Sequence, residues 1–298
     1  MKKFNYKKID AFATPNSDGN PAGYVWLNEN QQITGQEMLQ LAREQKGFVS
    51  EIGFVRQVND DLLELKYYSS EREVDFCGHA TIAILYDILK QKAEFTGRKT
   101  LSILTNRGLL TAYNHIPDQD AVFIMSPDPI YHDNTPNAES VCWNLSISKS
   151  DIDSNWPISI INAGLTTLIV PIAGLKNILE VELDMECVKD YCEESGIDII
   201  EMFCTEVSSQ ASDYRTRVFA PTFGYMEDPA TGSGNAALGY YLLQLGKWTK
   251  ETLTIEQNNE PDRFNVIKLK TITDTDNRKR VLFGGGAVTR IEGQCFLY

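Results

Sequence analysis

Metal-binding and disulfide motifs are missing from this 298-residue chain. Its three histidines, His79, His115 and His132, form no HxxxH pair, and its six cysteines form no CxxC pair. Zinc sites depend on closely spaced ligands, and disulfide-bonded secreted domains on a high density of cysteine. We therefore expect no metal, and we expect reduced thiols, as in a cytoplasmic protein.

Long apolar runs and an excess of positive charge are also missing. The longest nearly apolar stretch, 163–175, is too short and too polar to span a bilayer, and the basic residues 1–8 are followed by no apolar segment. The chain carries 28 Lys and Arg against 41 Asp and Glu, a net charge of −13. This charge disfavours nucleic-acid and anionic-membrane partners but permits a small anionic ligand.

The remaining composition is that of an ordinary globular protein, with 42% hydrophobic and 23% charged residues. Because single cores stop growing at about 250–300 residues, two domains are expected. A stretch rich in Pro, Asn, Asp and Ser, 115–155, is the expected junction. We place an N-terminal half-domain at 1–118, which a C-terminal strand at about 286–298 would complete, and a C-terminal half-domain at 119–285.

Short β-rich segments with alternating polarity make up most of the chain, which predicts an α+β fold. They include 24–27, 62–68, 121–125, 166–170, 215–219 and 266–269. A capping box from Thr34 to Glu37 predicts a helix that ends near Lys46, and 186–195 has the pattern of a short amphipathic helix.

Two further helical segments, 80–89 and 235–245, are apolar on nearly every side, which is typical of helices wrapped by strands. When Gly78 is set on Gly232, GHATIAILYDIL lies over GSGNAALGYYLL. A weaker match sets Phe54 on Phe203. An ancient duplication explains both matches. Chance similarity between two apolar helices is the alternative.

The first of these helices begins at Cys77-Gly78-His79. The free N–H groups and the helix dipole at such a start attract anions, and they lower the pKa of a nearby thiol. His79 lies in the first turn, where it can face a ligand. A purely structural helix start, with a buried cysteine and a capping histidine, is the alternative.

The second helix begins at a similar turn, Thr231-Gly232-Ser233-Gly234. Asp228 precedes a proline just before this turn, and Thr231 or Ser233 can cap the helix. If the two halves face each other, both helix starts point into one cleft. There they would stabilise a carboxylate and the negative charge of an enolate.

Glu51 is an acidic residue inside a β-rich apolar segment, GFVSEIGF. Burial of such a group would raise its pKa and suit it to proton transfer near neutral pH. Alternation along the segment also permits a side chain that faces solvent.

Taken together, the motifs resemble those of the phenazine-biosynthesis PhzF-like isomerases, which have the diaminopimelate-epimerase fold. In chain order the matching segments are IDAFAT, GNPAGYV, LAREQKGFVSEIGFV, CGHATIA, TNRGLLTAY, RVFAP, EDPATGSGNAALGYYL and GGGAVTRIEG. The resemblance implies two pseudo-symmetric domains, each a β-barrel-like sheet around a central apolar helix. It also implies a site between the domains, a homodimer, and neither metal nor organic cofactor.

The resemblance further implies roles for individual residues. Glu51 matches the general acid/base of the family, while His79, Asp228 and Ser233 match residues that line its site. We expect His79 and Asp228 to be catalytic with Glu51, by orienting the substrate or relaying a proton. Around these we expect the substrate to contact further residues at the two helix starts: Cys77, Gly78, Gly232 and Gly234. The expected activity is a cofactor-independent isomerisation in which a proton moves on a small carboxylate-bearing substrate.

Three alternatives follow from the same residues. Related epimerases use two cysteines, one at each helix start, whereas this chain offers only Cys77; the corresponding place in the second half is Ala230. An epimerase with Cys77 as a second base beside Glu51 stays open. A Cys–His hydrolase is disfavoured because residues two apart at a helix start point in different directions. The third alternative is a binding protein of the same fold that has no turnover.

Overall fold

The computed structural model describes all 298 residues as 18 strands and seven α-helices. Two compact units are distinguished, unit 1 at 1–125 with 284–298 and unit 2 at 126–283. From the sequence we placed the corresponding boundaries at 118/119 and 285/286. No helix combines the length and the apolar character needed to cross a membrane.

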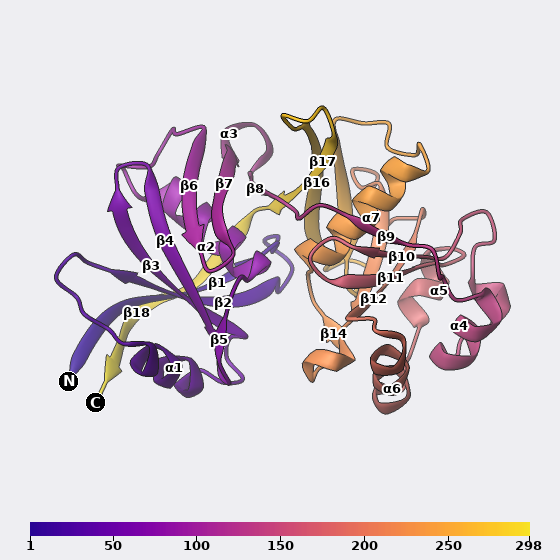
Figure 1. Cartoon of the computed structure of the whole chain (residues 1–298), viewed down its shortest axis with the longest axis horizontal. Helices are drawn as coiled ribbons and strands as arrows, with labels where there is room; N and C mark the ends of the chain where they lie inside the picture. Colours follow the sequence, from indigo (N-terminus) through magenta and orange to yellow (C-terminus); the bar gives the residue numbers. More distant parts are fainter. The chain divides into compact units, whose positions relative to one another are not determined.

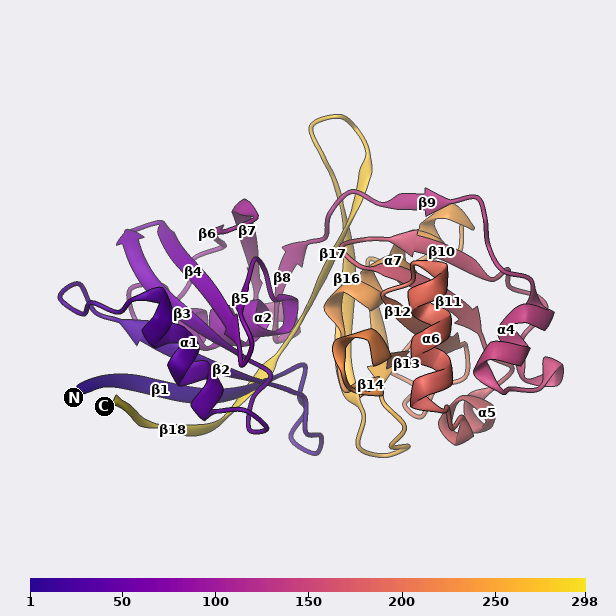
Figure 2. The ribbon, with the colours of Figure 1, turned by 60° about the horizontal axis from the view of Figure 1, so that its bottom comes forward.

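Unit 1 is a sheet that surrounds one helix (Figure 1). Its strands are β1 (Lys2–Ala11), β2 (Asn20–Leu27), β3 (Glu51–Asn59), β4 (Leu62–Ser69), β5 (Glu73–Val74), β6 (Thr100–Thr105), β7 (Gly108–His115), β8 (Ala121–Met125) and β18 (Ala287–Leu297). Its helices are α1 (Gly35–Glu44), α2 (Gly78–Gln91) and the short α3 (Ile116–Gln119). The C-terminal strand β18 pairs with β1 from Lys2 opposite Leu297 onward, so the two termini lie side by side (Figure 2).

Helix α2 is the centre of unit 1. Every residue from Ala80 to Leu89 is buried, and the helix contacts β1, β2, β3, β8 and β18. Helix α1 covers the opposite face of the sheet, where Met38 and Leu41 pack with Phe54. The expected capping box is present, because Thr34 and Glu37 each bond the other's backbone N–H. Because α2 has apolar side chains on all sides, every side must be shielded from water, and the surrounding strands shield it.

Unit 2 repeats this plan. Its strands are β9 (Ile130–His132), β10 (Ser159–Asn162), β11 (Thr166–Pro171), β12 (Ile199–Cys204), β13 (Tyr214–Phe219), β14 (Glu227–Asp228), β15 (Thr252–Gln257), β16 (Asn265–Thr273) and β17 (Lys279–Gly285), whose last residues belong to unit 1. Its helices are α4 (Ala138–Leu145), α5 (Leu175–Glu180), α6 (Met185–Ser195) and the buried α7 (Gly232–Gln244). The sequence did not predict α4 or α5.

The strand pairing confirms the pseudo-symmetry. In unit 1, β1 is antiparallel to β2, β2 parallel to β3, β3 antiparallel to β4, β4 antiparallel to β5, and β4 parallel to β6. In unit 2 the same orientations recur for β10 through β15 in the same order. The helices α2 and α7 occupy the same place in this order, between the fifth and sixth strands of each repeat.

The register of the ladders corrects the weaker sequence match. The residues in line across three strands are Val74–Tyr67–Gly53 in unit 1 and Asp228–Val218–Glu201 in unit 2. Gly53 therefore corresponds to Glu201, and Glu51 corresponds to Ile199. The match of Phe54 to Phe203 is wrong by one residue, and in a strand such a slip moves every side chain to the other face.

Candidate active site

The start of α2 is fixed by a chain of buried hydrogen bonds. The Thr81 hydroxyl donates to the Cys77 carbonyl at 2.6 Å, and since its proton is used there, the Tyr67 hydroxyl donates to Thr81 at 2.7 Å. Cys77 is the N-cap residue, yet its side chain makes no capping hydrogen bond. The backbone of this turn is thus held without the thiol, which contacts other side chains instead.

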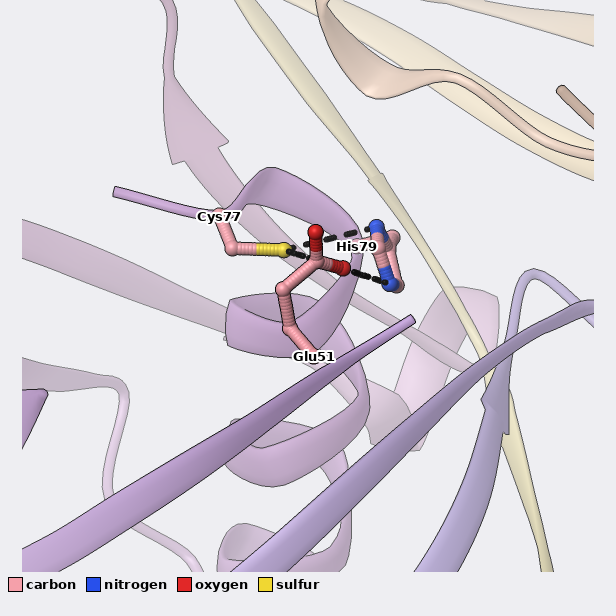
Figure 3. Close-up of side chains that lie close together, drawn as sticks. All are labelled: Glu51, Cys77 and His79. Atoms are coloured by element: carbon pink, nitrogen blue, oxygen red, sulfur yellow. Dashed lines mark hydrogen bonds and ion pairs between the residues drawn. The ribbon is translucent and has the colours of Figure 1, made fainter. Parts of the chain in front are cut away.

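Three of the expected site residues meet at this turn (Figure 3). The Cys77 sulfur lies 3.4 Å from Nδ1 of His79 and 3.7 Å from Oε2 of Glu51. Nε2 of His79 lies 3.4 Å from the same carboxylate oxygen. The side chains of Glu51 and His79 keep 21% and 14% of their surface exposed, so the cluster is sheltered and still reachable by a small ligand.

This cluster overturns two of our sequence-based arguments. We expected Cys77 and His79 to point in different directions, but the first turn of α2 brings their side chains into contact. The sequence also showed no HxxxH or CxxC pair, yet the structure brings Cys77 and His79 together with Glu51 in one group of possible metal ligands. Motif spacing missed it because the carboxylate comes from a strand and the other two groups from a helix.

Strand pairing sets the direction of Glu51. As the first residue of β3, it pairs with Ala22 of β2 and Ser69 of β4. Alternation puts it on the same face as Gly53, where an added Cβ would lie 2.2 Å from the Ile84 side chain of α2. Glu51 therefore faces the helix rather than solvent, and the alternative of an outward-facing strand residue is wrong.

His79 is neutral at pH 7 because burial lowers its pKa to about 4. The Pro21 carbonyl accepts a hydrogen bond from the ring and opposes this shift. A neutral imidazole has one donor and one acceptor nitrogen, so Pro21 leaves an acceptor nitrogen toward the cluster. The contact between His79 and Glu51 is then a pairing of a neutral ring with a carboxyl group, suited to proton exchange rather than to charge pairing.

Pro21 is a site residue that sequence reasoning missed. Its carbonyl also accepts the backbone N–H of Ser50 at 3.4 Å, so one oxygen holds both His79 and the residue before Glu51. The GNPAGYV segment was a signal for it, since a proline fixes the backbone at this point.

In unit 2, a side-chain network surrounds the start of α7. The Asp228 carboxylate accepts a short hydrogen bond from the Thr231 hydroxyl. The Gln257 side chain accepts from the Thr231 backbone N–H at 2.9 Å and from the Asn235 amide at 2.8 Å, and it donates to the Asp228 carbonyl at 2.8 Å. The network fixes the orientation of Asp228 and the entry of the chain into α7.

Two further expectations for this turn are wrong. Neither Thr231 nor Ser233 caps α7 with its side chain. The Thr231 hydroxyl donates its hydrogen bond to the Asp228 carboxylate instead. Thr231, rather than Ala230, takes the place of Cys77, because both are the N-cap residues of equivalent helices. Gly232, Ser233 and Gly234 form the first turn as expected.

Glu201 is a buried acid that the sequence reasoning also missed. It has no exposed surface, and neither oxygen of its carboxyl group has a hydrogen-bond partner. A Cβ added at Gly234 would lie 2.6 Å from one of these oxygens, so the carboxyl group occupies the space that a side chain at Gly234 would need. Burial raises the pKa of Glu201 well above its usual range, which keeps the group neutral.

Comparisons with known proteins agree with this architecture. A Bacillus subtilis (strain 168) protein named "Uncharacterized isomerase YfhB" is 28% identical, over 97% of each chain. The crystal structure of a Bacillus anthracis phenazine biosynthesis protein of the PhzF family has a TM-score of 0.86 at 24% identity and covers 100% of both chains. A hydroxyproline epimerase from Agrobacterium vitis, solved with bound trans-4-hydroxy-L-proline, has a TM-score of 0.59 at 10% identity, over 99% and 92% of the two chains.

The expected two-domain fold is thereby confirmed, and the prediction of an isomerase agrees with the names of these relatives. The "phenazine biosynthesis-like protein" family, PhzC-PhzF, matches residues 9–293. With nearly the whole chain matched and the paired units in place, the chain belongs to the PhzC-PhzF family.

Proposed function

We propose that the protein is a cofactor-independent isomerase in which Glu51 moves a proton on a small carboxylate-bearing substrate. The observation that carries this proposal is the Glu51 carboxylate 3.4 Å from the neutral ring of His79, at the start of a buried helix. A carboxyl group beside the acceptor nitrogen of a neutral imidazole, in a largely buried cluster, is suited to general acid/base catalysis.

In the proposed reaction, Glu51 takes a proton from a carbon next to, or conjugated with, the substrate carboxylate. The electron pair left behind is delocalised into the carboxylate, and the proton returns at another carbon, so nothing is oxidised or reduced. The N–H groups of the first turn of α2, from Gly78 onward, and the positive end of its dipole would stabilise the anion.

The same geometry bears on the epimerase alternative. An epimerase holds its two bases on opposite faces of one carbon, each about 3–3.5 Å from it, so the bases stand about 6–7 Å apart. The sulfur of Cys77 lies only 3.7 Å from the Glu51 carboxylate, too close for a carbon to fit between them. This favours proton removal and return on one face of the substrate, with Cys77 as a contact of the substrate.

Residues of unit 2 enter the proposal through the family resemblance. Asp228, Gly232, Ser233 and Gly234 are proposed to bind or orient the substrate, and the idea that both helix starts serve one site stays a prediction. A homodimer is likewise expected, and sedimentation equilibrium would test it.

Solvent-deuterium incorporation tests the activity. Small carboxylates with an allylic or α C–H bond would be incubated with the protein in D₂O and examined by NMR. Exchange by the wild type that is lost in Glu51→Gln and kept in Glu44→Gln, an exposed residue of α1, would support the proposal. A ligand that raises the melting temperature but exchanges no proton would instead indicate a binding protein.

A further inference from the structure

The cluster at the start of α2 has a second chemical property besides proton transfer. Glu51, Cys77 and His79 each offer one ligand atom, and these atoms all lie within 4.8 Å of one another. Sulfur, imidazole nitrogen and carboxylate oxygen are the three donors that Zn²⁺ prefers in proteins. Ca²⁺ and Mg²⁺ prefer oxygen donors alone, so the set selects against them.

The distances fit a tetrahedral ion. With metal–ligand bonds of about 2.3 Å to sulfur and about 2.0–2.1 Å to nitrogen and oxygen, tetrahedral angles separate the ligand atoms by about 3.3–3.6 Å. In the structure, Oε2 of Glu51 lies 3.4 Å from Nε2 of His79 and 3.7 Å from the Cys77 sulfur. The sulfur lies 3.9 Å from the same nitrogen. Shifts of a few tenths of an ångström would close the site.

The backbone around the ligands is already ordered. Cys77 and His79 flank Gly78 in a turn that the hydrogen bonds of Thr81 hold, and Glu51 is fixed by pairing on both sides of β3. Binding would therefore require rotation of side chains only. Three protein ligands leave a fourth position open, the arrangement found where a zinc ion also carries water or a substrate atom.

We propose that Glu51, Cys77 and His79 form a zinc site with a capacity of one ion per chain. The pseudo-symmetry supports this stoichiometry, since unit 2 has Ile199, Thr231 and Ser233 at the corresponding positions. A bound ion would occupy the Glu51 oxygen and stop proton transfer. This inhibition rests on the proposed function, whereas the binding of zinc does not.

The test is a calorimetric titration of the EDTA-treated, dialysed full chain with ZnCl₂, supported by the absorption of the Co²⁺-loaded protein. Wild type should bind one Zn²⁺ and show a thiolate-to-cobalt charge-transfer band. Cys77→Ser, His79→Asn and Glu51→Gln should each weaken binding by at least about tenfold, the loss that even an outer-shell partner's removal causes. Cys187→Ser, which removes an exposed thiol of α6, should change neither result.

Two results would overturn the proposal: no stoichiometric binding by folded wild type, or binding that survives Cys77→Ser and His79→Asn. Circular dichroism would establish that each variant is folded, and three separate ligand variants keep the test decisive if one is not. Deuterium exchange measured with EDTA present separates the two proposals. Zinc binding without Glu51-dependent exchange would refute the proposed function but not the zinc site. Exchange without zinc binding would refute the zinc site but not the proposed function.

Discussion

The Glu51 carboxylate lies 3.4 Å from the imidazole of His79, although one residue opens a strand and the other lies in the first turn of a helix. Two backbone features bring them together. The pleat of β3 directs Glu51 toward α2, and the Pro21 carbonyl holds both the His79 ring and the Ser50 backbone. The proposed chemistry depends on this contact, because a neutral imidazole beside the carboxyl group gives the proton a path between them.

Thr81 should matter for stability as well as for the site. Thr81→Val removes the hydroxyl that joins the Cys77 carbonyl to Tyr67 and leaves a buried phenol without an acceptor. We expect the free energy of unfolding to fall by about 1–3 kcal/mol, measured by urea denaturation. Thr96→Val, which removes an exposed hydroxyl that bonds Lys92, is the matched control and should change it little. Equal effects of the two variants would contradict this role for Thr81.

Glu201 should make the stability depend on pH. Its pKa is raised in the folded protein, so the folded state keeps a proton that the unfolded chain loses above about pH 4.3. Stability is then highest below that pH and falls as the pH rises toward the folded pKa. In Glu201→Gln this contribution is absent, so unfolding free energies measured from pH 5 to pH 9 should fall less steeply than in wild type. If stability falls equally steeply with pH in the variant and in wild type, Glu201 does not cause the pH dependence.

Gly234 should be intolerant of a side chain. In Gly234→Ala, the new Cβ would lie 2.6 Å from an oxygen of the buried Glu201 carboxyl group. Overpacking of this kind destabilises by about 1–3 kcal/mol, which thermal unfolding would detect. Gly293→Ala, at a position with open space, is the control. Combining Gly234→Ala with Glu201→Ala should recover part of the lost stability, because the new Cβ and the Glu201 carboxyl group would occupy the same space. If the destabilising effects of the two substitutions simply add, the clash is not their cause.

Asp228 is a separate test of the contribution of unit 2. In Asp228→Asn, an oxygen remains to accept the Thr231 hydroxyl, so the start of α7 should be preserved. If the charge of Asp228 serves the reaction, turnover should fall by about 10²-fold or more, while the melting temperature stays near that of wild type. Unchanged turnover would remove Asp228 from the proposed catalytic residues.

The sequence predicted the features that depend on local pattern. Apolar residues on every side of 80–89 and 235–245 indicated two wrapped helices, which are α2 and α7. It failed where position depends on distant pairing. The contact of Glu51 with Cys77 and His79 follows from the register of β3, which no local spacing records.

A slip of one residue explains two other errors. The sequence comparison placed Ala230 opposite Cys77 and Phe203 opposite Phe54. Each assignment is wrong by one residue, the first at a helix N-cap and the second in a strand. Glu201 carried the same signal as Glu51, an acid within an apolar run, IIEMFC. The two acids differ in their packing. Glu201 is fully enclosed against Gly234, whereas Glu51 keeps part of its side chain exposed.

Solvent-deuterium incorporation by two variants, measured side by side on the same substrate, is the most direct test of the central claim. Glu51→Gln should lower the exchange rate by about 10²–10⁴-fold, whereas Cys77→Ala should retain most of the wild-type rate, since Cys77 is proposed to contact the substrate without transferring its proton. Exchange that persists in Glu51→Gln would contradict the account, and an equal loss in both variants would replace it with a two-base mechanism.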